Sequence, residues 1–261
     1  MRNIRVAGIL LLVGVISATA GTSVSLAEVI ETFETAADPF PGTVYDNWSF
    51  VSANDTAAAK VVVNGDNGVL EMWRTGAATG DGRAVQTASD LFGTATFIDR
   101  YSDGFSVMAD IGATAAGSNG SRNVGISVGN IVAFYYPGVG GTSNFGWRNL
   151  STGSYISHTA IGWTPTVSTS LPLQQMLVNV QPVGDDYRLS VMLTEGDNAF
   201  SVVETFTAAQ LGTPDNAGLF FRCATTDGNA LFDNFTVVPE PGTLLLLTTG
   251  LMALLVRRRR A

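Results

Sequence analysis

The chain has 261 residues, with 14 lysines and arginines against 22 aspartates and glutamates, and a formal net charge of −8 at pH 7. Six of the basic residues lie in two terminal segments, so residues 28–240 hold eight basic and 22 acidic side chains, a net charge of −14. Such an excess of negative charge disfavours nucleic acid and anionic membrane surfaces as partners. We therefore expect no nucleic-acid partner.

A single cysteine and a single histidine limit the chemistry further. Cys223 cannot form an intrachain disulfide, and its place in an alternating apolar segment favours a buried, inert thiol over a reactive one. His158 cannot build a multi-histidine zinc site, and a Ser-His-Asp triad would depend on it alone. It stands in a polar run that we predict to be a surface loop.

Residues 1–27 have the parts of a secretory signal peptide. Two arginines within the first five residues precede Val6–Ile16, an apolar stretch too short to span a membrane. Small residues then favour cleavage by signal peptidase between Ala27 and Glu28, with cleavage after Ala20 as the alternative. A buried N-terminal strand would leave the positive start unexplained. We therefore predict export.

Residues 28–238 read as one all-β domain. Short alternating segments are separated by Gly-, Asn- and Asp-rich turns, and one helical turn is expected at Thr207–Leu211. So many short strands in about 210 residues indicate a single antiparallel two-sheet sandwich of the jelly-roll type. The predicted strands are Val29–Glu34, Lys60–Val63, Val69–Trp73, Gly104–Asp110, Asn123–Val128, Ile131–Tyr136, Asn144–Arg148, Leu173–Val180, Tyr187–Leu193, Ala199–Phe206, Ala217–Cys223 and Ala230–Val238.

The first and last of these strands carry a resemblance. The sequences Glu31-Thr-Phe-Glu34 and Leu231-Phe-Asp-Asn-Phe-Thr-Val-Val resemble the terminal strands of concanavalin-like and laminin-G-like jelly rolls. The resemblance implies that the terminal strands pair as neighbours and that the meander from Met176 to Phe206 lies in one sheet.

The same resemblance implies a structural calcium ion where the terminal strands meet. Its ligands would be Glu31, Glu34 and Asp233, and an acidic domain suits a hard cation. The alternative is that Asp233 and Asn234 cap a bulge while the glutamates face solvent.

Hydrolysis and sugar binding are the two carbohydrate functions to weigh. Laminarinase-like hydrolases of this fold carry Glu-x-Asp-x-x-Glu, but Glu195-Gly-Asp197 lacks the third carboxylate and has turn chemistry, which disfavours an enzyme. Sugar binding would need exposed aromatic rings. The candidates Trp147, Tyr155 and Trp163 lie in or beside a Gly/Ser/Thr-rich connection, and core filling is the alternative for both tryptophans.

The C-terminal tail has three parts in order. A proline-flanked glutamate breaks the last strand, an apolar run follows, and four arginines hold the end on the cytoplasmic side of a membrane. Residues 243–256 would extend roughly 21 Å as a helix, short of a hydrocarbon core of about 30 Å. A temporary membrane anchor fits this length better than a permanent one. The residues that define the tail are Pro239, Glu240, Pro241, Arg257, Arg258, Arg259 and Arg260.

Residues 239–261 resemble the PEP-CTERM sorting signal of Gram-negative bacteria. That resemblance implies recognition by an exosortase in the inner membrane, cleavage near Pro-Glu-Pro, and delivery to the cell surface or extracellular matrix. We therefore predict a non-enzymatic, exported surface protein associated with extracellular polysaccharide, with signal peptidase and exosortase as partners during export. A carbohydrate-binding lectin-like module is the alternative, and a glycoside hydrolase is less favoured.

Overall fold

The computed structural model of the protein describes residues 28–31, 33, 48–52, 57–64, 67–75, 79–114, 122–138, 143–224 and 228–239. The predicted signal peptide, Glu34, and the tail beyond Pro239 lie outside these ranges. Among the described residues, no helix is both long enough and apolar enough to cross a membrane.

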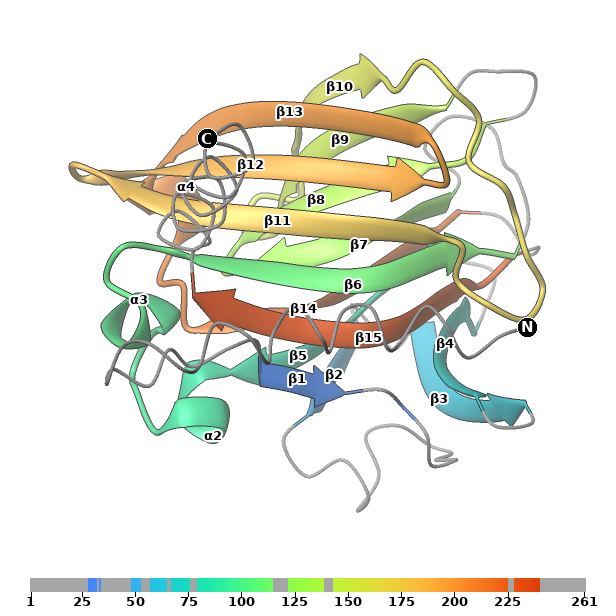
Figure 1. The fold of residues 1–261 in the computed structure, drawn as a ribbon, viewed down its shortest axis with the longest axis horizontal. Coiled ribbons are helices and arrows are strands. Elements are labelled where there is room, and N and C mark those ends of the chain that lie inside the picture. Colours follow the sequence, from blue (N-terminus) through green and yellow to red (C-terminus); the bar gives the residue numbers. More distant parts are fainter. Residues whose placement is uncertain are drawn as a thin grey trace, which may run out of the picture.

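The described residues form two stacked antiparallel sheets, one of eight strands and one of seven (Figure 1). The larger sheet has the order β13 (Asn198–Thr207), β12 (Asp186–Glu195), β11 (Gln174–Val183), β6 (Phe105–Ala113), β15 (Ala230–Pro239), β4 (Asn67–Arg74) and β3 (Ala57–Asn64), with β1 (Glu28–Glu31) also paired to β15. The seven-stranded sheet has the order β10 (Tyr155–Ala160), β9 (Asn144–Asn149), β8 (Ile131–Tyr136), β7 (Arg122–Val128), β14 (Asn216–Cys223), β5 (Gly80–Thr87) and β2 (Ser49–Ser52).

The chain crosses repeatedly between the sheets, and the crossings at β4–β5, β6–β7 and β14–β15 set the order of the central strands. As a result, β15 lies between β4 and β6 in one sheet while β14 lies between β5 and β7 in the other. This wrapping of neighbouring strands around a shared core is the jelly-roll arrangement that the strand pattern predicted. The pairing of the first and last strands, β1 with β15, is also as expected, and so is the β11–β12–β13 meander.

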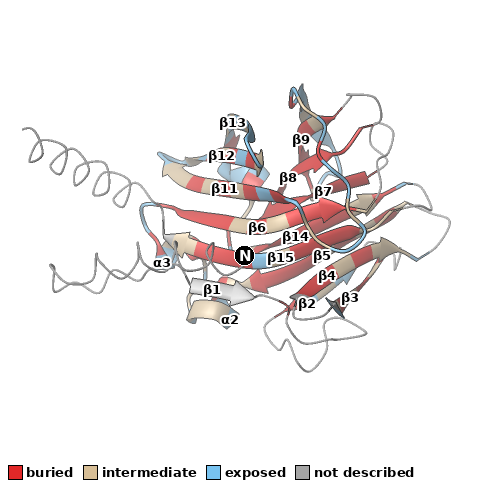
Figure 2. Ribbon diagram, turned by 45° about the vertical axis from the view of Figure 1, so that its right-hand side comes forward, coloured by how far each residue is buried: buried red, intermediate tan, exposed pale blue. Residues whose placement is uncertain are grey.

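The core lies between the two sheets. Alternation sends every second side chain inward, so Leu219, Phe221 and Cys223 of β14 all join the main apolar cluster. The burial of Cys223 agrees with the prediction of a buried thiol. Central strands of both sheets, including β6, β14 and β15, are buried along most of their length (Figure 2).

Short helices lie at one end of the sandwich (Figure 1). Helix α2 (Ala88–Phe92) follows β5, and α3 (Phe97–Arg100) begins at a capping box made by Thr96 and Asp99. Helix α4 (Ala208–Leu211) is the helical turn predicted near Thr207, whose side chain caps it together with Gln210.

Two features of the strands differ from the sequence expectation. Strands β2, β5 and β10 were not predicted, because they are short, glycine-containing or polar. His158 lies on β10 and not in a loop, although its side chain is exposed as expected. Its ring lies beside those of Phe134 and Tyr155, at centroid distances of 5.8 and 5.1 Å.

Candidate functional site

The seven-stranded sheet has a second face that points away from the core, called here the outer face. On β14, Phe220 and Arg222 point to this side, since Leu219, Phe221 and Cys223, which alternate with them, join the core. Phe220 forms a small apolar cluster there with Val132, Phe134 and Tyr136 of β8. The outer face therefore has an apolar cluster of its own, and polar side chains lie on the same face.

Three polar residues form one row across adjacent strands of the outer face. The antiparallel registers place Arg222 of β14 opposite Asp81 of β5 on one side and opposite Asn123 of β7 on the other. Arg222 Nη1 lies 3.5 Å from Asp81 Oδ2, which makes an ion pair. The row thus follows directly from strand pairing, because paired residues share a face.

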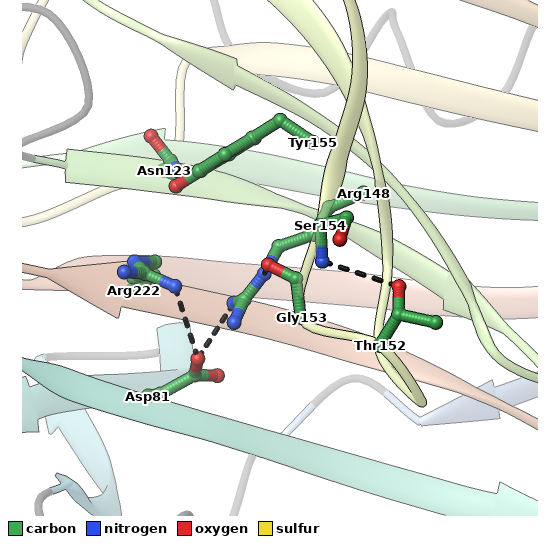
Figure 3. A network of polar contacts seen from close by, with 8 residues as sticks. All are labelled: Asp81, Asn123, Arg148, Thr152, Gly153, Ser154, Tyr155 and Arg222. Carbon is green, nitrogen blue, oxygen red and sulfur yellow. Dashed lines mark hydrogen bonds and ion pairs between the residues drawn. The ribbon is translucent and has the colours of Figure 1, made fainter.

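Arg148 reaches the same aspartate from β9 (Figure 3). Its Nη1 donates to Asp81 Oδ2 at 2.6 Å, while its Nε donates to the carbonyl oxygen of Gly153 at 3.3 Å. Only 9% of the Arg148 side chain and 17% of the Asp81 side chain are exposed, so this pair is shielded from solvent. One carboxylate oxygen therefore serves two guanidinium groups.

Tyr155 lies across this group of charges (Figure 3). Its hydroxyl accepts a hydrogen bond from Asn123 Nδ2 at 3.0 Å. The guanidinium carbons of Arg148 and Arg222 lie 5.8 and 5.7 Å from the centre of its ring, within the range of cation–π attraction. Even so, 39% of Tyr155 remains exposed. We call Asp81, Asn123, Arg148, Tyr155 and Arg222 the Tyr155 cluster.

The turn between β9 and β10 holds Tyr155 and Arg148 in position. Asn149 Oδ1 accepts hydrogen bonds from Ser151 Oγ at 2.7 Å and from the backbone N–H of Thr152 at 3.1 Å. Gly153 has a φ of 70°, a conformation that glycine adopts without strain. Because these bonds are local, the turn presents the carbonyl oxygen of Gly153 to Arg148 whether or not a ligand is bound.

The Tyr155 cluster has hydrogen-bonding capacity that the protein itself does not use. Asn123 is 0% exposed, yet within the described part of the chain its Oδ1 has no hydrogen-bond partner, and neither does the buried Nε of Arg222. Buried polar atoms are usually paired, so unused ones call for an explanation such as a bound ligand or water. One unused acceptor and one unused donor therefore lie on neighbouring strands within the cluster.

The predicted sugar-contact residues are separated by the fold. Trp147 is 1% exposed and points into the core, where its ring lies 5.1 Å from those of Phe145 and Phe206. This position corrects the expectation of a ligand contact, because the ring reaches no surface. Trp163 is half-buried and packs against the core. Of the three predicted aromatics, Tyr155 alone belongs to the cluster.

The predicted calcium ligands are described only in part. Asp233 pairs with Asp110 of β6, and its Oδ1 accepts a hydrogen bond from the backbone N–H of Asn234 at 2.7 Å. A bulge follows at this point of β15. The side chain of Glu31 and all of Glu34 lie outside the described residues. Among those described, no group of three or more His, Cys, Asp or Glu could hold a metal ion, and calcium binding stays a prediction.

Glu195 is the last residue of β12, and Asp197 lies in the predicted turn before β13. Glu195 Oε2 accepts hydrogen bonds from Gln174 Nε2 at 2.8 Å and from the backbone N–H of Thr166 at 2.9 Å. Gln174 Oε1 in turn accepts the hydroxyl of Tyr135 at 2.6 Å. Burial, reinforced by the charge of Glu195, raises the pKa of Tyr135 far above its usual range. Glu195 and Gln174 line a pocket of about 240 Å³.

Four of the five residues of the Tyr155 cluster were not predicted from the sequence. Asp81 stands between two glycines and has the composition of a turn. Arg222 interrupts the otherwise apolar segment Ala217–Cys223, and Arg148 follows Phe145 and Trp147 in β9, which is the signal that could have found both arginines. A positively charged side chain in a strand that is buried on both faces needs an oppositely charged partner. Because side chains alternate along a strand, each arginine lies on the face of the sheet away from its neighbouring core aromatic residue.

Comparisons with known proteins match the tail to a known sorting motif and find solved structures similar to the sandwich. Residues 237–260 match the PEP-CTERM protein-sorting motif, as the tail predicted. No curated protein matches the chain. Among solved structures, the fold is similar to the Ca²⁺-bound exoplasmic/lumenal domain of VIP36, at 9% identity and a TM-score of 0.46, covering 81% of this chain and 89% of that one. It is also similar to lectin II from Ulex europaeus, at 13% identity and a TM-score of 0.47, covering 83% of this chain and 99% of that one.

Proposed function

We propose that this protein is a non-enzymatic surface protein of a Gram-negative bacterium that binds extracellular polysaccharide. In this proposal, a signal peptide directs export and an exosortase recognises the C-terminal tail in the inner membrane. The β-sandwich is then presented at the cell surface or in the extracellular matrix. The Tyr155 cluster is the binding site.

The export half of the proposal is supported by the tail. The PEP-CTERM motif begins at Val237, inside β15, so the sorting signal is continuous with a central strand of the sandwich. The signal-peptide pattern of residues 1–27 supports the same route.

The binding half is supported by one arrangement, the half-exposed ring of Tyr155 framed by polar side chains. Aromatic rings offer an apolar face to the C–H groups of a sugar, while amide and guanidinium groups bind its hydroxyls. The guanidinium groups of Arg148 and Arg222 lie beside that ring and supply N–H donors. Nothing in this arrangement requires a reaction, so binding without turnover is the function proposed.

Export is tested by changing Arg257–Arg260 together to serine or together to lysine. Serine removes the positive charge that stops the tail at the membrane, so we expect uncut, mislocalised protein. Lysine keeps the charge and should preserve delivery. The measurements are the mass of the protein recovered and its share at the cell surface. Unchanged mass and delivery in the serine variant would refute the sorting proposal.

Binding is tested by screening the full-length chain, purified in mild detergent, against an array of glycans. Tyr155→Ala should weaken binding to the glycans retained by about tenfold, equivalent to about 1.4 kcal/mol. Tyr187→Ala, on β12 of the other sheet, is the matched control and should bind normally. Incubation of the same glycans with the protein should release no product. Absence of any retained glycan would contradict the proposal, and release of product would favour a hydrolase.

A further inference from the structure

The two sheets differ sharply in charge. The strands of the seven-stranded sheet contain four arginines and a single acidic residue, Asp81, whereas the strands of the eight-stranded sheet contain three basic and eight acidic residues. The domain as a whole is strongly acidic, so its composition alone would predict an excess of acidic residues in both sheets. The excess of arginine in the seven-stranded sheet is the opposite. Charges of one sign gathered on a surface attract ligands of the other sign.

Three of the four arginines share the outer face. Arg83 is paired with Phe220, and Arg148 and Arg222 belong to the Tyr155 cluster. The fourth, Arg122, is paired with the core residue Cys223 and so lies on the other side of the sheet. Burial lowers the pKa of Arg83 while the charge of Asp81 raises it, and an arginine remains protonated under all ordinary conditions. Three positive charges therefore surround one carboxylate.

Asp81 does not saturate the arginines it contacts. A guanidinium offers five N–H donors, and a carboxylate binds it best through two parallel bonds. Here both Arg148 and Arg222 approach the same oxygen, Oδ2, at 2.6 and 3.5 Å. Among the described residues, the buried Nε of Arg222 has no hydrogen-bond partner, while 24% of the side chain as a whole is exposed. Donors for a second carboxylate are thus present beside Tyr155.

We propose that the Tyr155 cluster recognises a carboxylate-bearing sugar, a uronate unit of an acidic polysaccharide. This inference rests on the proposed function and names the class of its ligand. The uronate carboxylate binds Arg222 and Arg148, and the sugar ring contacts Tyr155. Asp81 acts as an internal counter-ion that holds the arginines in place before the ligand carboxylate binds them.

Asp81 competes with the ligand carboxylate for the two arginines, so a neutral variant of Asp81 should bind the ligand differently. Asp81→Asn keeps the shape of the side chain but removes its charge, so two arginines lose their counter-ion and gain attraction for an external one. We expect this variant to bind an acidic glycan about three- to tenfold more tightly. Binding by both proteins should weaken as salt is added, because salt screens the attraction between charges.

The experiment measures binding to the full-length chain in mild detergent by calorimetry, in buffer free of divalent cations. The probes are a short oligogalacturonate, its methyl ester, an oligosaccharide of neutral sugars that carries added sulfate groups, and oligoglutamate. The methyl ester keeps the sugar backbone and removes the charge. Oligoglutamate keeps the carboxylates and removes the sugar. Arg222→Gln is the test variant, and Arg188→Gln on β12 is its matched control, since it makes the same charge change on the other sheet.

We expect oligogalacturonate to bind and the methyl ester to bind at least about tenfold more weakly. Arg222→Gln should lose at least about tenfold in affinity for oligogalacturonate, while Arg188→Gln stays within about twofold. The thermal midpoint of each variant confirms that it is folded. Should Arg222→Gln prove unfolded, the opposite effect expected of Asp81→Asn decides the matter.

The remaining outcomes separate this inference from the proposed function. Equal binding of the acid and its methyl ester overturns the inference and leaves carbohydrate binding intact. Binding of the sulfated probe but not of oligogalacturonate overturns the assignment to uronate. Equal binding of oligoglutamate and oligogalacturonate shows an anion site without sugar recognition and overturns both. Absence of binding to every probe and to every glycan of the array also overturns both.

Discussion

Tyr135 is a hydroxyl group placed wholly inside the sandwich. It is 0% exposed, and its hydroxyl donates to Gln174, which also contacts Glu195. Ionising this tyrosine in the folded protein would create a buried negative charge next to another one. The neutral form is therefore strongly favoured in the folded state and has no such advantage in the unfolded chain.

This difference predicts how Tyr135 affects stability at high pH. An unfolded tyrosine loses its proton near pH 10, whereas folded Tyr135 keeps it, so from pH 10 upward the folded state loses about 1.4 kcal/mol per pH unit relative to the unfolded state. Tyr135→Phe removes this loss. At pH 8, however, it should cost about 1–2 kcal/mol, because Gln174 Oε1 is left unpaired.

The measurement is urea unfolding of both proteins at pH 8, 10, 11 and 12. The stability advantage of the natural protein over Tyr135→Phe should shrink above pH 10, vanish at about pH 11 and reverse by about pH 12. Tyr187→Phe, at a half-buried position on β12, is the control and should change stability at pH 8 by less than about 0.5 kcal/mol. A gap that stays constant from pH 8 to pH 12 would contradict the linkage.

At the scale of the elements, strand β15 contains a well-defined bulge near Asn234. Asn234 has a φ of 52°, and its side-chain amide donates to Asp110 Oδ2 at 2.7 Å. Its backbone N–H donates to Asp233, and the register with β6 shifts between Asp233 and Thr236. Asparagine tolerates this left-handed conformation better than most residues, so the residue type at position 234 favours the bulge.

Substitutions at Asn234 should separate its backbone role from its side-chain bonds. Asn234→Gly keeps the conformation and loses only the amide bonds, whereas Asn234→Val forces a β-branched residue into a positive φ. We expect the valine variant to be less stable than the glycine variant by about 1–2 kcal/mol. Thermal unfolding of the two proteins measures the difference. Equal midpoints would show that the bulge relaxes when its asparagine is lost.

The strands that could be predicted are those whose signals are local. Alternation and tight turns are read within ten residues, which is why Ile131–Tyr136 and the three-strand meander agree with the structure. Strand β5 escaped because its sequence GDGRAVQT begins with two glycines and an aspartate, which are rare in strands. Its pairing with β14 and β2 comes from partners distant in the sequence.

The Tyr155 cluster could be predicted only through Tyr155. Its members come from five strands of one sheet, so long-range pairing and not local pattern brings them together. The error over Trp147 has a related cause. Strands β8 and β9 are buried on both faces, so alternation alone could not tell which of Trp147 and Arg148 faces the core.

At the scale of the whole molecule, the sorting motif and the sandwich overlap. Val237 is a core residue with 0% exposure, yet it is also the first residue of the PEP-CTERM match. Thr236 and Val237 pair with β1 on one side and β6 on the other, and Pro239 is paired with Phe105. The folded domain therefore needs the chain as far as Pro239.

Two truncations test this requirement. A chain ending at Pro239 should melt within a degree or two of the full-length protein, whereas a chain ending at Phe235 loses four paired positions and buried Val237. Loss of the valine alone should cost roughly 2 kcal/mol, or roughly 4–8 °C in the thermal midpoint. Circular dichroism on heating measures both. Equal midpoints for the two chains would show that the last four residues do not contribute to the fold.

The direct succession of β14 and β15 also has a mechanical consequence. Arg222 stands on β14, and the very next strand runs into the tail by which the protein is proposed to be sorted. Tension between a polysaccharide held at Arg222 and an anchor at the mature C-terminus would pass along these two strands. Because β15 is bonded to strands on both of its edges, a pull along its axis must shear many hydrogen bonds at once. The strands hydrogen-bonded to β15 would therefore share the load.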